Sequence, residues 1–382
     1  MFLKRLAVSL LFSLLPFIAH ADDKRPAMPN PKAPAAQKAI ADGDLVKAAV
    51  EMQPRPDDGI FQSIFPLVGY EPTYGAFVGG GYFRRKVEGQ EPQSEWSIVG
   101  LVSQQLAVKM EYRLDRTIGG RWRLIVRNEL GNGFESNYGL GNDTSTANRV
   151  DVELWKDELD VFFPYAVTKR FRVGPWIEHR IRRNHRQDPA ELARQLDRLP
   201  DREATLALGF KEELDFRDVP ENPSLGWRQA LRVMMGQPYS GPVDRTFLVI
   251  DTDIQLFQYL MNKDLVLATS LAGGVIFGDA PFLSQFKLGG TDRLRGFYNN
   301  RFRGSKYYIQ QSEIRFPIWD LVSGASFLEF GEATERHFSR ANVSYGAGLR
   351  IGIPPDKVSK VRIDYAMSRD QQGVFVDFAH AF

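Results

Sequence analysis

Apolar and polar side chains alternate along most of this chain, from Phe61 to Phe382. The segment 342–353 shows the pattern best, because every second residue is apolar and the residues between them are small, polar or charged. A period of two places successive side chains on opposite faces of a β-strand. The pattern predicts an all-β protein. It fits both a soluble sandwich with an apolar core and a transmembrane barrel with an apolar outer face.

The number of alternating segments favours the barrel. They recur over about 320 residues, whereas one sandwich needs about 100. Short turns, such as 261–263 and 320–321, alternate along the chain with long loops at 135–150, 185–202 and 279–304. Alternately short and long connections are typical of bacterial outer-membrane barrels, which have an even number of strands. We therefore predict a transmembrane antiparallel β-barrel of about 16 strands, at 62–70, 74–86, 94–103, 105–116, 120–134, 151–167, 171–184, 203–217, 226–239, 246–260, 264–278, 305–319, 322–335, 341–354, 357–369 and 373–382.

The N-terminus has the features of a secretory signal peptide. Lys4 and Arg5 precede the apolar run 6–18, which is followed by Ala-His-Ala at 19–21. This order of charge, apolar core and small residues predicts a signal peptide at 1–21. Residues 22–60 are a Pro/Ala-rich leader with too few large apolar side chains to bury a core, and we expect a periplasmic leader there, with a short plug or docking helix as the alternative. The barrel is predicted to occupy residues 61–382.

Composition excludes several other classes of protein. Beyond residue 21 there is no apolar run of about 18 residues, the length that a membrane-spanning helix needs. The chain has 0 cysteines, so disulfides and thiolate metal sites are excluded. Without Lys4 and Arg5 it has 47 cationic and 47 acidic residues, so a nucleic-acid partner is not expected. The remaining histidines have no ligand spacing, and we expect neither a metal nor a cofactor.

The last ten residues, GVFVDFAHAF, form an alternating segment in which Phe378 and Phe382 share the apolar face with Val374. A terminal aromatic residue on such a strand is the signal by which the barrel assembly machinery recognises outer-membrane barrels. We therefore predict that Phe378 and Phe382 form a C-terminal assembly signal, although an ordinary final strand would show the same pattern. The assembly machinery is then an expected partner during biogenesis.

The loop from Phe286 to Gly304, FKLGGTDRLRGFYNNRFRG, contains the pair Gly289-Gly290, which is typical of a turn. This loop and the later segments SEIRFP, FLEFG, YGAGLRIGIP and VRIDYAM resemble the bacterial surface antigen (BamA/TamA-like) superfamily of outer-membrane barrels. The resemblance is strong over 203–382 and weaker over 61–186, where YGLGNDT is the main match. The chain is identified as a short member that lacks the POTRA domains of larger members.

The resemblance implies that the loop folds inward as a lid. By its motifs, Arg295, Gly296 and Phe297 would form the tip of the lid, and Glu313 and Glu329 would be its partners on the lumen wall. The family usually has Asp where Glu329 stands.

The residues themselves suit these roles. Glu313 alternates with apolar Ile314, so it would face the lumen. A guanidinium can fork between carboxylates in a way that Lys cannot. Gly296 permits a turn where a Cβ would collide, and Phe297 offers an apolar anchor. The alternative is a surface loop whose arginines contact the phosphates of lipopolysaccharide.

The resemblance also implies a function, which is the insertion of proteins into the outer membrane or their translocation across it. The seam between the first and last strands would open, and the lid would move. A passive or gated pore and a lipid-active barrel enzyme are the alternatives. Asp251 and Asp253 share a strand face and would be catalytic acids or lumen lining; without a partner motif, lining is favoured and an enzyme is not expected. We expect a Gram-negative outer-membrane protein in contact with lipid and lipopolysaccharide, with clients that the sequence does not identify.

Overall fold

The computed structural model of the chain describes residues 58–71, 75–88, 91–186, 201–220, 222–319, 321–352, 360–378 and 381–382. The predicted signal peptide and residues 22–57 of the predicted leader lie outside this part of the chain. Residues 58–60, which were predicted to end the leader, belong to the first strand.

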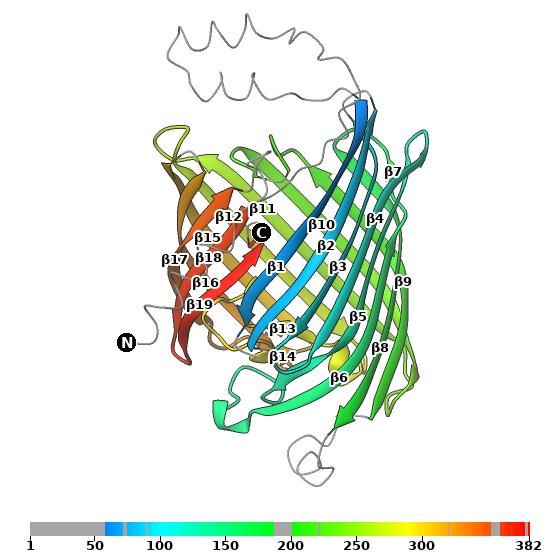
Figure 1. Cartoon of the computed structure of the whole chain (residues 1–382). Coiled ribbons are helices and arrows are strands. Elements are labelled where there is room, and N and C mark those ends of the chain that lie inside the picture. The colour runs from blue at the N-terminus through cyan, green and yellow to red at the C-terminus, as the bar shows by residue number, and fades with distance from the viewer. Residues whose placement is uncertain are drawn as a thin grey trace, which may run out of the picture.

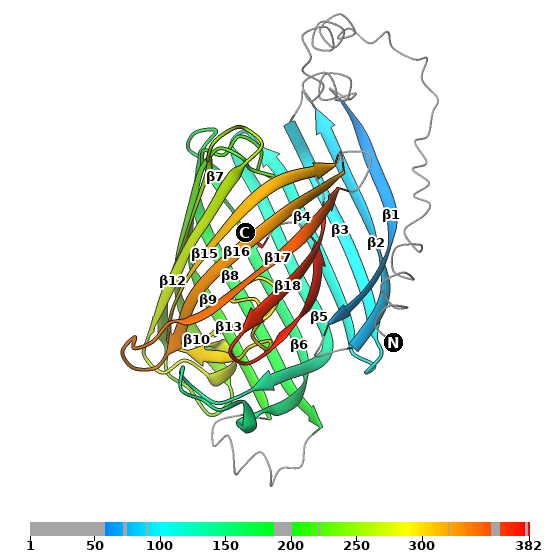
Figure 2. The ribbon, with the colours of Figure 1, turned by 90° about the vertical axis from the view of Figure 1, so that its left-hand side faces the viewer.

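The described residues form a large antiparallel sheet that curves into a barrel (Figure 1, Figure 2). One of its 17 strands, β7 (Tyr165–Ala166), has only two residues. The others match the predicted strands in number and confirm the barrel: β1 (Asp58–Glu71), β2 (Gly75–Glu88), β3 (Glu91–Ser103), β4 (Val108–Gly119), β5 (Trp122–Asn137), β6 (Val150–Phe162), β8 (Phe171–Arg186), β9 (Arg202–Asp215), β10 (Gly226–Ser240), β11 (Phe247–Tyr259), β12 (Val266–Phe277), β15 (Lys306–Trp319), β16 (Val322–Thr334), β17 (Asn342–Gly352), β18 (Lys360–Ser368) and β19 (Gln372–Phe378).

Each long strand pairs with the next one along the chain, β6 with β8 and β12 with β15 included. The exception is the seam between β1 and β19. Cα atoms of these two strands come within 8 Å of each other. However, no register of paired residues joins the described parts of β1 and β19. Within the described strands, hydrogen-bonded ladders therefore join all the other neighbours, whereas β1 and β19 lie close to each other without a ladder.

Charged side chains line the inside of the barrel and apolar ones cover the outside. Phe210, Met235 and Leu271 point outward and are 66%, 60% and 50% exposed, whereas Glu313 and Asp364 face inward and are 0% exposed. This is the reverse of a soluble protein and is the pattern of a barrel whose outer face contacts lipid. No helix among the described residues has the length and apolarity to span a bilayer.

The long connections 138–149 and 278–305 lie at the end of the barrel opposite to Asp58, where β1 begins. We call this the outer end. Each of these loops contains one short 3-10 helix, η1 (Thr146–Asn148) and η2 (Phe282–Ser284). The loop 278–305 also forms a small hairpin of β13 (Phe286–Leu288) and β14 (Phe302–Gly304). Figure 1 places this hairpin near the outer end, within the outline of the barrel.

Candidate functional site

The loop between β12 and β15, residues 278–305, is the lid loop. Its predicted turn has positive φ values at Gly289 and Gly290, +108° and +122°. A Cβ on Gly289 would lie 2.2 Å from the carbonyl oxygen of Tyr298, so no other residue fits there without a shift of the backbone. The Gly289 N–H donates to the carbonyl of Arg293 at 3.0 Å, which closes the turn. The turn brings the two arms of the loop together and sets the direction of its tip.

An apolar cluster attaches the lid loop to the wall. Phe297 is fully buried, and its ring meets that of Phe302 edge-on with centroids 5.2 Å apart. Lid residues Leu288 and Leu294 belong to the same cluster. The wall contributes Ala272, Tyr307, Ile309 and Ala333. Phe297 is thus the apolar anchor that the sequence predicted, with a hydrophobic surface on the lumen side of β12, β15 and β16.

Gly296 brings the tip of the lid against β18. Its φ is +85°, and a Cβ there would lie 3.0 Å from the backbone carbon of Met367. The hydroxyl of Ser368 donates to the Gly296 carbonyl at 2.5 Å. Leu294, two residues before Gly296, also has a positive φ of 59°, which is unusual for a bulky side chain. The tight turn over 294–296 places Arg295 deep in the lumen.

Arg295 is fully buried and contacts three carboxylates on the wall. Its Nε donates to Glu329 at 2.6 Å, and its Nη1 donates to Glu313 at 2.7 Å and to Asp364 at 2.8 Å. The guanidinium carbon also lies 3.6 Å from the ring centroid of Phe327. Burial alone lowers the pKa of Arg295, but the three carboxylates raise it above its usual range, so the side chain stays cationic. The two predicted wall partners, Glu313 and Glu329, are where the motif placed them.

Asp364 is a third partner that the sequence analysis did not name. Four arginines share the three carboxylates, because Arg315 bonds to Glu313 at 2.9 Å and Arg350 and Arg362 lie beside Asp364. We call these seven side chains the lid–wall ion cluster: Arg295, Arg315, Arg350, Arg362, Glu313, Glu329 and Asp364. The alternation within VRIDYAM already places Asp364 on the lumen face. Its proximity to Arg295 depends on the register of β17 and β18, which alternation does not fix.

The lid loop is also tied to the wall near its hairpin. Lys287 contacts Glu135 at 2.8 Å, and Arg303 contacts the same carboxylate. Arg303 also donates to the carbonyl of Phe282 at 2.7 Å. Burial lowers the pKa of Lys287 to about 8; nearby Arg303 adds to this lowering and Glu135 opposes it.

A second tie joins the lid loop to its neighbours at the outer end. The Nε of Arg301 donates to Asp370 at 2.6 Å, and its Nη1 donates to the hydroxyl of Thr144 at 2.7 Å. Thr144 ends the YGLGNDT segment of loop 138–149. Arg301 is 2% exposed, although it lies at the outer end of the barrel. Sequence reasoning missed this arginine because its partners come from loops far apart in the chain.

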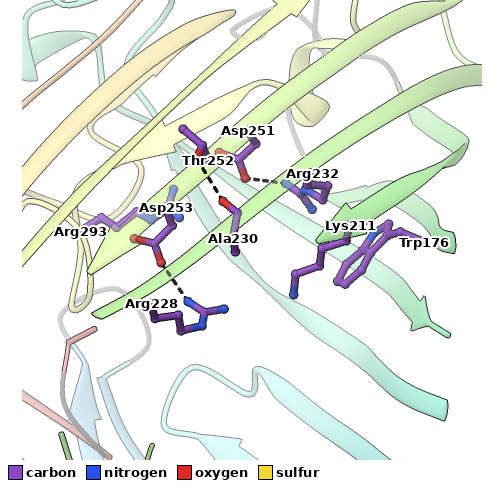
Figure 3. Close-up of a pocket in the computed structure, with 9 residues that line it drawn as sticks. All are labelled: Trp176, Lys211, Arg228, Ala230, Arg232, Asp251, Thr252, Asp253 and Arg293. Carbon is purple, nitrogen blue, oxygen red and sulfur yellow. Dashed lines mark hydrogen bonds and ion pairs between the residues drawn. The ribbon is translucent and has the colours of Figure 1, made fainter. Parts of the chain in front are cut away.

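Below the lid, a lumen cavity of about 250 Å³ lies against β9, β10 and β11 (Figure 3). Asp251 accepts from Arg232 at 3.0 Å and from the Tyr307 hydroxyl at 2.6 Å. Asp253 lies 3.3 Å from Arg228. Both carboxylates therefore have cationic partners, as lumen lining would. No group of His, Cys, Asp or Glu in the described ranges could hold a metal ion.

The C-terminal segment differs from the prediction. The alternation predicted a strand to residue 382, but β19 ends at Phe378, and the side chain of Phe378 lies outside the described residues. Phe382 is not part of a strand and lines a second lumen cavity of about 470 Å³. The guanidinium of Arg315, which lies 5.4 Å from its ring centroid, holds it there. A role of Phe378 and Phe382 as an assembly signal stays a prediction.

Comparison with known families gives a match over most of the chain. The model of the Omp85 superfamily domain matches residues 104–376. A curated relative, the chloroplastic outer envelope protein 80 of Arabidopsis thaliana, is 27% identical over 119 residues. That match covers 28% of this chain and 16% of the relative, so the chain spans only a small part of the relative's length.

Three solved barrels have a similar fold. BamA from Haemophilus ducreyi lacking POTRA domains 1–3 has a TM-score of 0.57 at 15% identity and matches 83% of this chain and 70% of its own. CdiB from Escherichia coli has a TM-score of 0.59 at 12% identity, over 84% of this chain and 62% of its own. CdiB from Acinetobacter baumannii has a TM-score of 0.55 at 11% identity, over 84% and 59%. The match to the family model confirms the predicted family resemblance, and the three solved barrels confirm the predicted barrel fold.

Proposed function

Because the chain belongs to the Omp85 superfamily, we propose that it inserts proteins into the outer membrane of a Gram-negative bacterium or translocates them across it. The family contains assembly and translocation proteins, and the chain is similar in fold to BamA and CdiB. The apolar outer face would contact membrane lipid and, in the outer leaflet, lipopolysaccharide. The barrel assembly machinery would place the chain in the membrane.

The unpaired seam is the observation that carries this proposal. β1 pairs with β2 and β19 pairs with β18, but no ladder joins the described parts of β1 and β19. An unpaired strand edge offers a row of N–H and C=O groups to an incoming strand. Inside a bilayer each unsatisfied group costs several kcal/mol, so strand addition at this edge is strongly favourable. A client strand would pair with β1 or β19 as it enters the membrane, and no nucleotide is needed for this step.

Disulfides across the seam test the proposal. The chain has 0 cysteines, so introduced pairs are unambiguous. A panel would combine one cysteine in β1 with one in β19, and oxidation would identify the pairs that close the seam. The assay follows the insertion of a small outer-membrane barrel into proteoliposomes. With the seam closed by an oxidised disulfide, insertion should fall to the level seen with empty liposomes. Reduction of the disulfide should restore the higher level.

A disulfide between strands that are already paired provides the control. Ile98 and Tyr112 are register partners in β3 and β4, so a cysteine pair there adds a cross-link without affecting the seam. This variant should keep its activity under oxidation. Full insertion activity with an oxidised seam would contradict the proposal.

A gated pore is a second candidate, favoured by the two charged cavities in the lumen. It predicts ion conductance in planar bilayers that rises when the lid is released. We propose that the chain is not an enzyme, because Asp251 and Asp253 are engaged with arginines. Lipid hydrolysis by the purified protein would contradict this.

A further inference from the structure

The lumen cavity of about 250 Å³ below the lid has more cations than carboxylates in its wall (Figure 3). Two carboxylates line it, Asp251 and Asp253. Four cationic side chains line it as well: Lys211, Arg228, Arg232 and Arg293. Asp251 accepts from Arg232 at 3.0 Å and Asp253 accepts from Arg228 at 3.3 Å, so both carboxylates are already engaged. The lining therefore carries an excess of positive charge.

Two of the cations, Lys211 and Arg232, stand directly opposite each other. They are register partners in β9 and β10, and both line the cavity. Like charges at such positions repel and destabilise a sheet. The Lys211 ammonium and the Arg232 guanidinium carbon also lie 4.9 Å and 5.7 Å from the ring centroid of Trp176, so one ring holds both cations. Carboxylates outside this lining compensate in part, because Glu213 contacts Lys211 at 2.7 Å and Glu178 contacts Arg232 at 3.1 Å.

Arg293 brings a further cation to the cavity from the lid loop. Its guanidinium carbon lies 5.2 Å from the ring centroid of Tyr307. Arg293 is exposed within the lumen, and no carboxylate in the described part of the chain forms an ion pair with it. Arg295, two positions later, contacts three carboxylates. The head group of Arg293 is therefore available to an added anion.

The size of the cavity limits what can bind there. Ala230 lies between Arg228 and Arg232 on the lumen face of β10, and its small side chain leaves open the space that the two arginines flank. The volume of about 250 Å³ is below the range of about 300–1,000 Å³ that is typical of sites for drug-sized ligands. The cavity thus suits a small ion and has no room for the acyl chains of a lipid.

We propose that this cavity binds a small phosphate-type oxyanion from the aqueous phase, and that the ion connects Arg293 of the lid to Lys211 and Arg232 of the wall. A guanidinium matches two phosphate oxygens at once, and an ammonium adds a point charge. A phosphate has enough oxygens to contact lid and wall together, whereas a carboxylate has only two. The bound ion offsets the repulsion between the opposed cations. It also adds a tie between lid and wall that is separate from the lid–wall ion cluster.

Isothermal titration calorimetry of the full chain in detergent tests the site. Inorganic pyrophosphate is the probe, and constant ionic strength keeps general screening unchanged during the titration. The wild type should show one saturable site. Arg293→Met should weaken the affinity by about tenfold or more, because a hydrogen bond between charged groups is lost. Since Arg293 is exposed and forms no ion pair with a described residue, this variant should fold as the wild type does.

Ala230→Leu tests the space instead of the charge. It fills the floor of the cavity and keeps every cation, so it should also weaken binding by about tenfold or more, whereas general attraction to a positive lumen would persist. Heat-modifiable migration on gels would establish that the variant is folded, and Arg293→Met decides the test if it is not. Arg127→Met is the matched control, because Arg127 lines the second lumen cavity but not this one, and its ion pairs are with Glu111 and Glu129. It should keep its affinity within about twofold of the wild type.

Proteolysis of the lid loop tests the link between the ion and the lid. With a protease that needs no metal ion, pyrophosphate should slow cleavage of the lid loop in the wild type and leave it unchanged in Arg293→Met. The site would be overturned by a wild type without saturable binding, by equal affinity in Arg293→Met, or by equal weakening in Arg127→Met. Cleavage of the wild type at the same rate with and without pyrophosphate would overturn the tie to the lid. Neither measurement includes a client protein, so failure of either would leave the proposed insertion function standing.

Discussion

Glu329 contacts both the side chain and the main chain of Arg295. Its Oε1 accepts from Arg295 Nε at 2.6 Å, and its Oε2 accepts from the Arg295 backbone N–H at 2.6 Å. The carboxylate therefore fixes the orientation of the guanidinium and the path of the lid backbone together. The glutamate that stands in place of the family's usual aspartate reaches far enough to do both.

Arg295→Ala should release the lid. The substitution leaves Glu313, Glu329 and Asp364 without their shared cation in a buried site, which costs about 3–5 kcal/mol. We expect faster proteolysis of the lid loop in vesicles and a higher conductance in planar bilayers. Arg245→Ala is the control, because Arg245 is 79% exposed in its pair with Asp279 at the outer end. Identical proteolysis and conductance in the wild type and Arg295→Ala would show that Arg295 does not hold the lid.

The variants Glu329→Asp and Glu329→Gln distinguish the contribution of the length of the Glu329 side chain from that of its charge. Asp keeps the charge but is one methylene shorter, so it loses one of the two bonds to Arg295 at a cost of about 1.5–3 kcal/mol. Gln keeps the reach but leaves the arginines of the cluster with one carboxylate fewer. Urea unfolding should rank the stabilities as wild type, then Glu329→Asp, then Glu329→Gln. The reverse order of the two variants would mean that reach outweighs charge.

Gly348→Ala should displace Asp364. A Cβ on Gly348 would lie 2.0 Å from the Asp364 carboxylate and 2.5 Å from the Ile363 carbonyl. Overpacking of this kind costs about 1–3 kcal/mol, and the contact with Arg295 would be lost as well. The matched control is Gly100→Ala in β3, where a Cβ meets nothing within 4 Å. Equal unfolding midpoints for the two alanine variants would argue against this account of Gly348.

The charge of Lys287 predicts a pH dependence of stability. Its pKa is lowered to about 8 in the folded chain from an ordinary value of 10.5, mainly by burial. Between these values the unfolded chain binds more protons at this site, so the free energy of unfolding should rise with pH. Below pH 8 the amine is charged in both states and its contribution is flat.

Urea unfolding at several pH values would measure this effect. Lys287→Met removes the titration, so the stability of the wild type relative to this variant should increase from about pH 8 to 10.5. Lys287→Arg keeps a cation that does not titrate there and should also lack the increase. A constant difference between the wild type and both variants across this range would contradict the lowered pKa.

The barrel was predictable because it depends on a local property. Period-two alternation and the lengths of the turns identify the strands without any knowledge of long-range contacts. The lid tip was also predictable, because the motif around Arg295 fixes its partners Glu313 and Glu329 through the family resemblance. The structure places all three as that resemblance implied.

The other functional contacts depend on register and on loops. Asp364 joins the ion cluster only because Gly348, its register partner on β17, leaves room for its carboxylate. Arg301 meets Thr144 across 157 positions of the chain. The position of Phe382 contradicts its local pattern, because a buried arginine on another strand holds it in the lumen. Alternation along the sequence does not predict the position of a side chain where contacts with distant parts of the chain determine it. In this chain those contacts lie around the lid and the seam.

The ties of Arg301 and Arg303 have a consequence for how the outer end opens. These side chains are 2% and 1% exposed, and they join the lid loop to residues of loop 138–149, strand β5 and the turn after β18. Breaking one tie exposes the partners of the next, so partial release gains little and the loops should separate together. The ionic current through a single barrel should then switch between a few well-defined levels instead of changing gradually. The dwell times should be set by the slow, concerted release of the loops at the outer end.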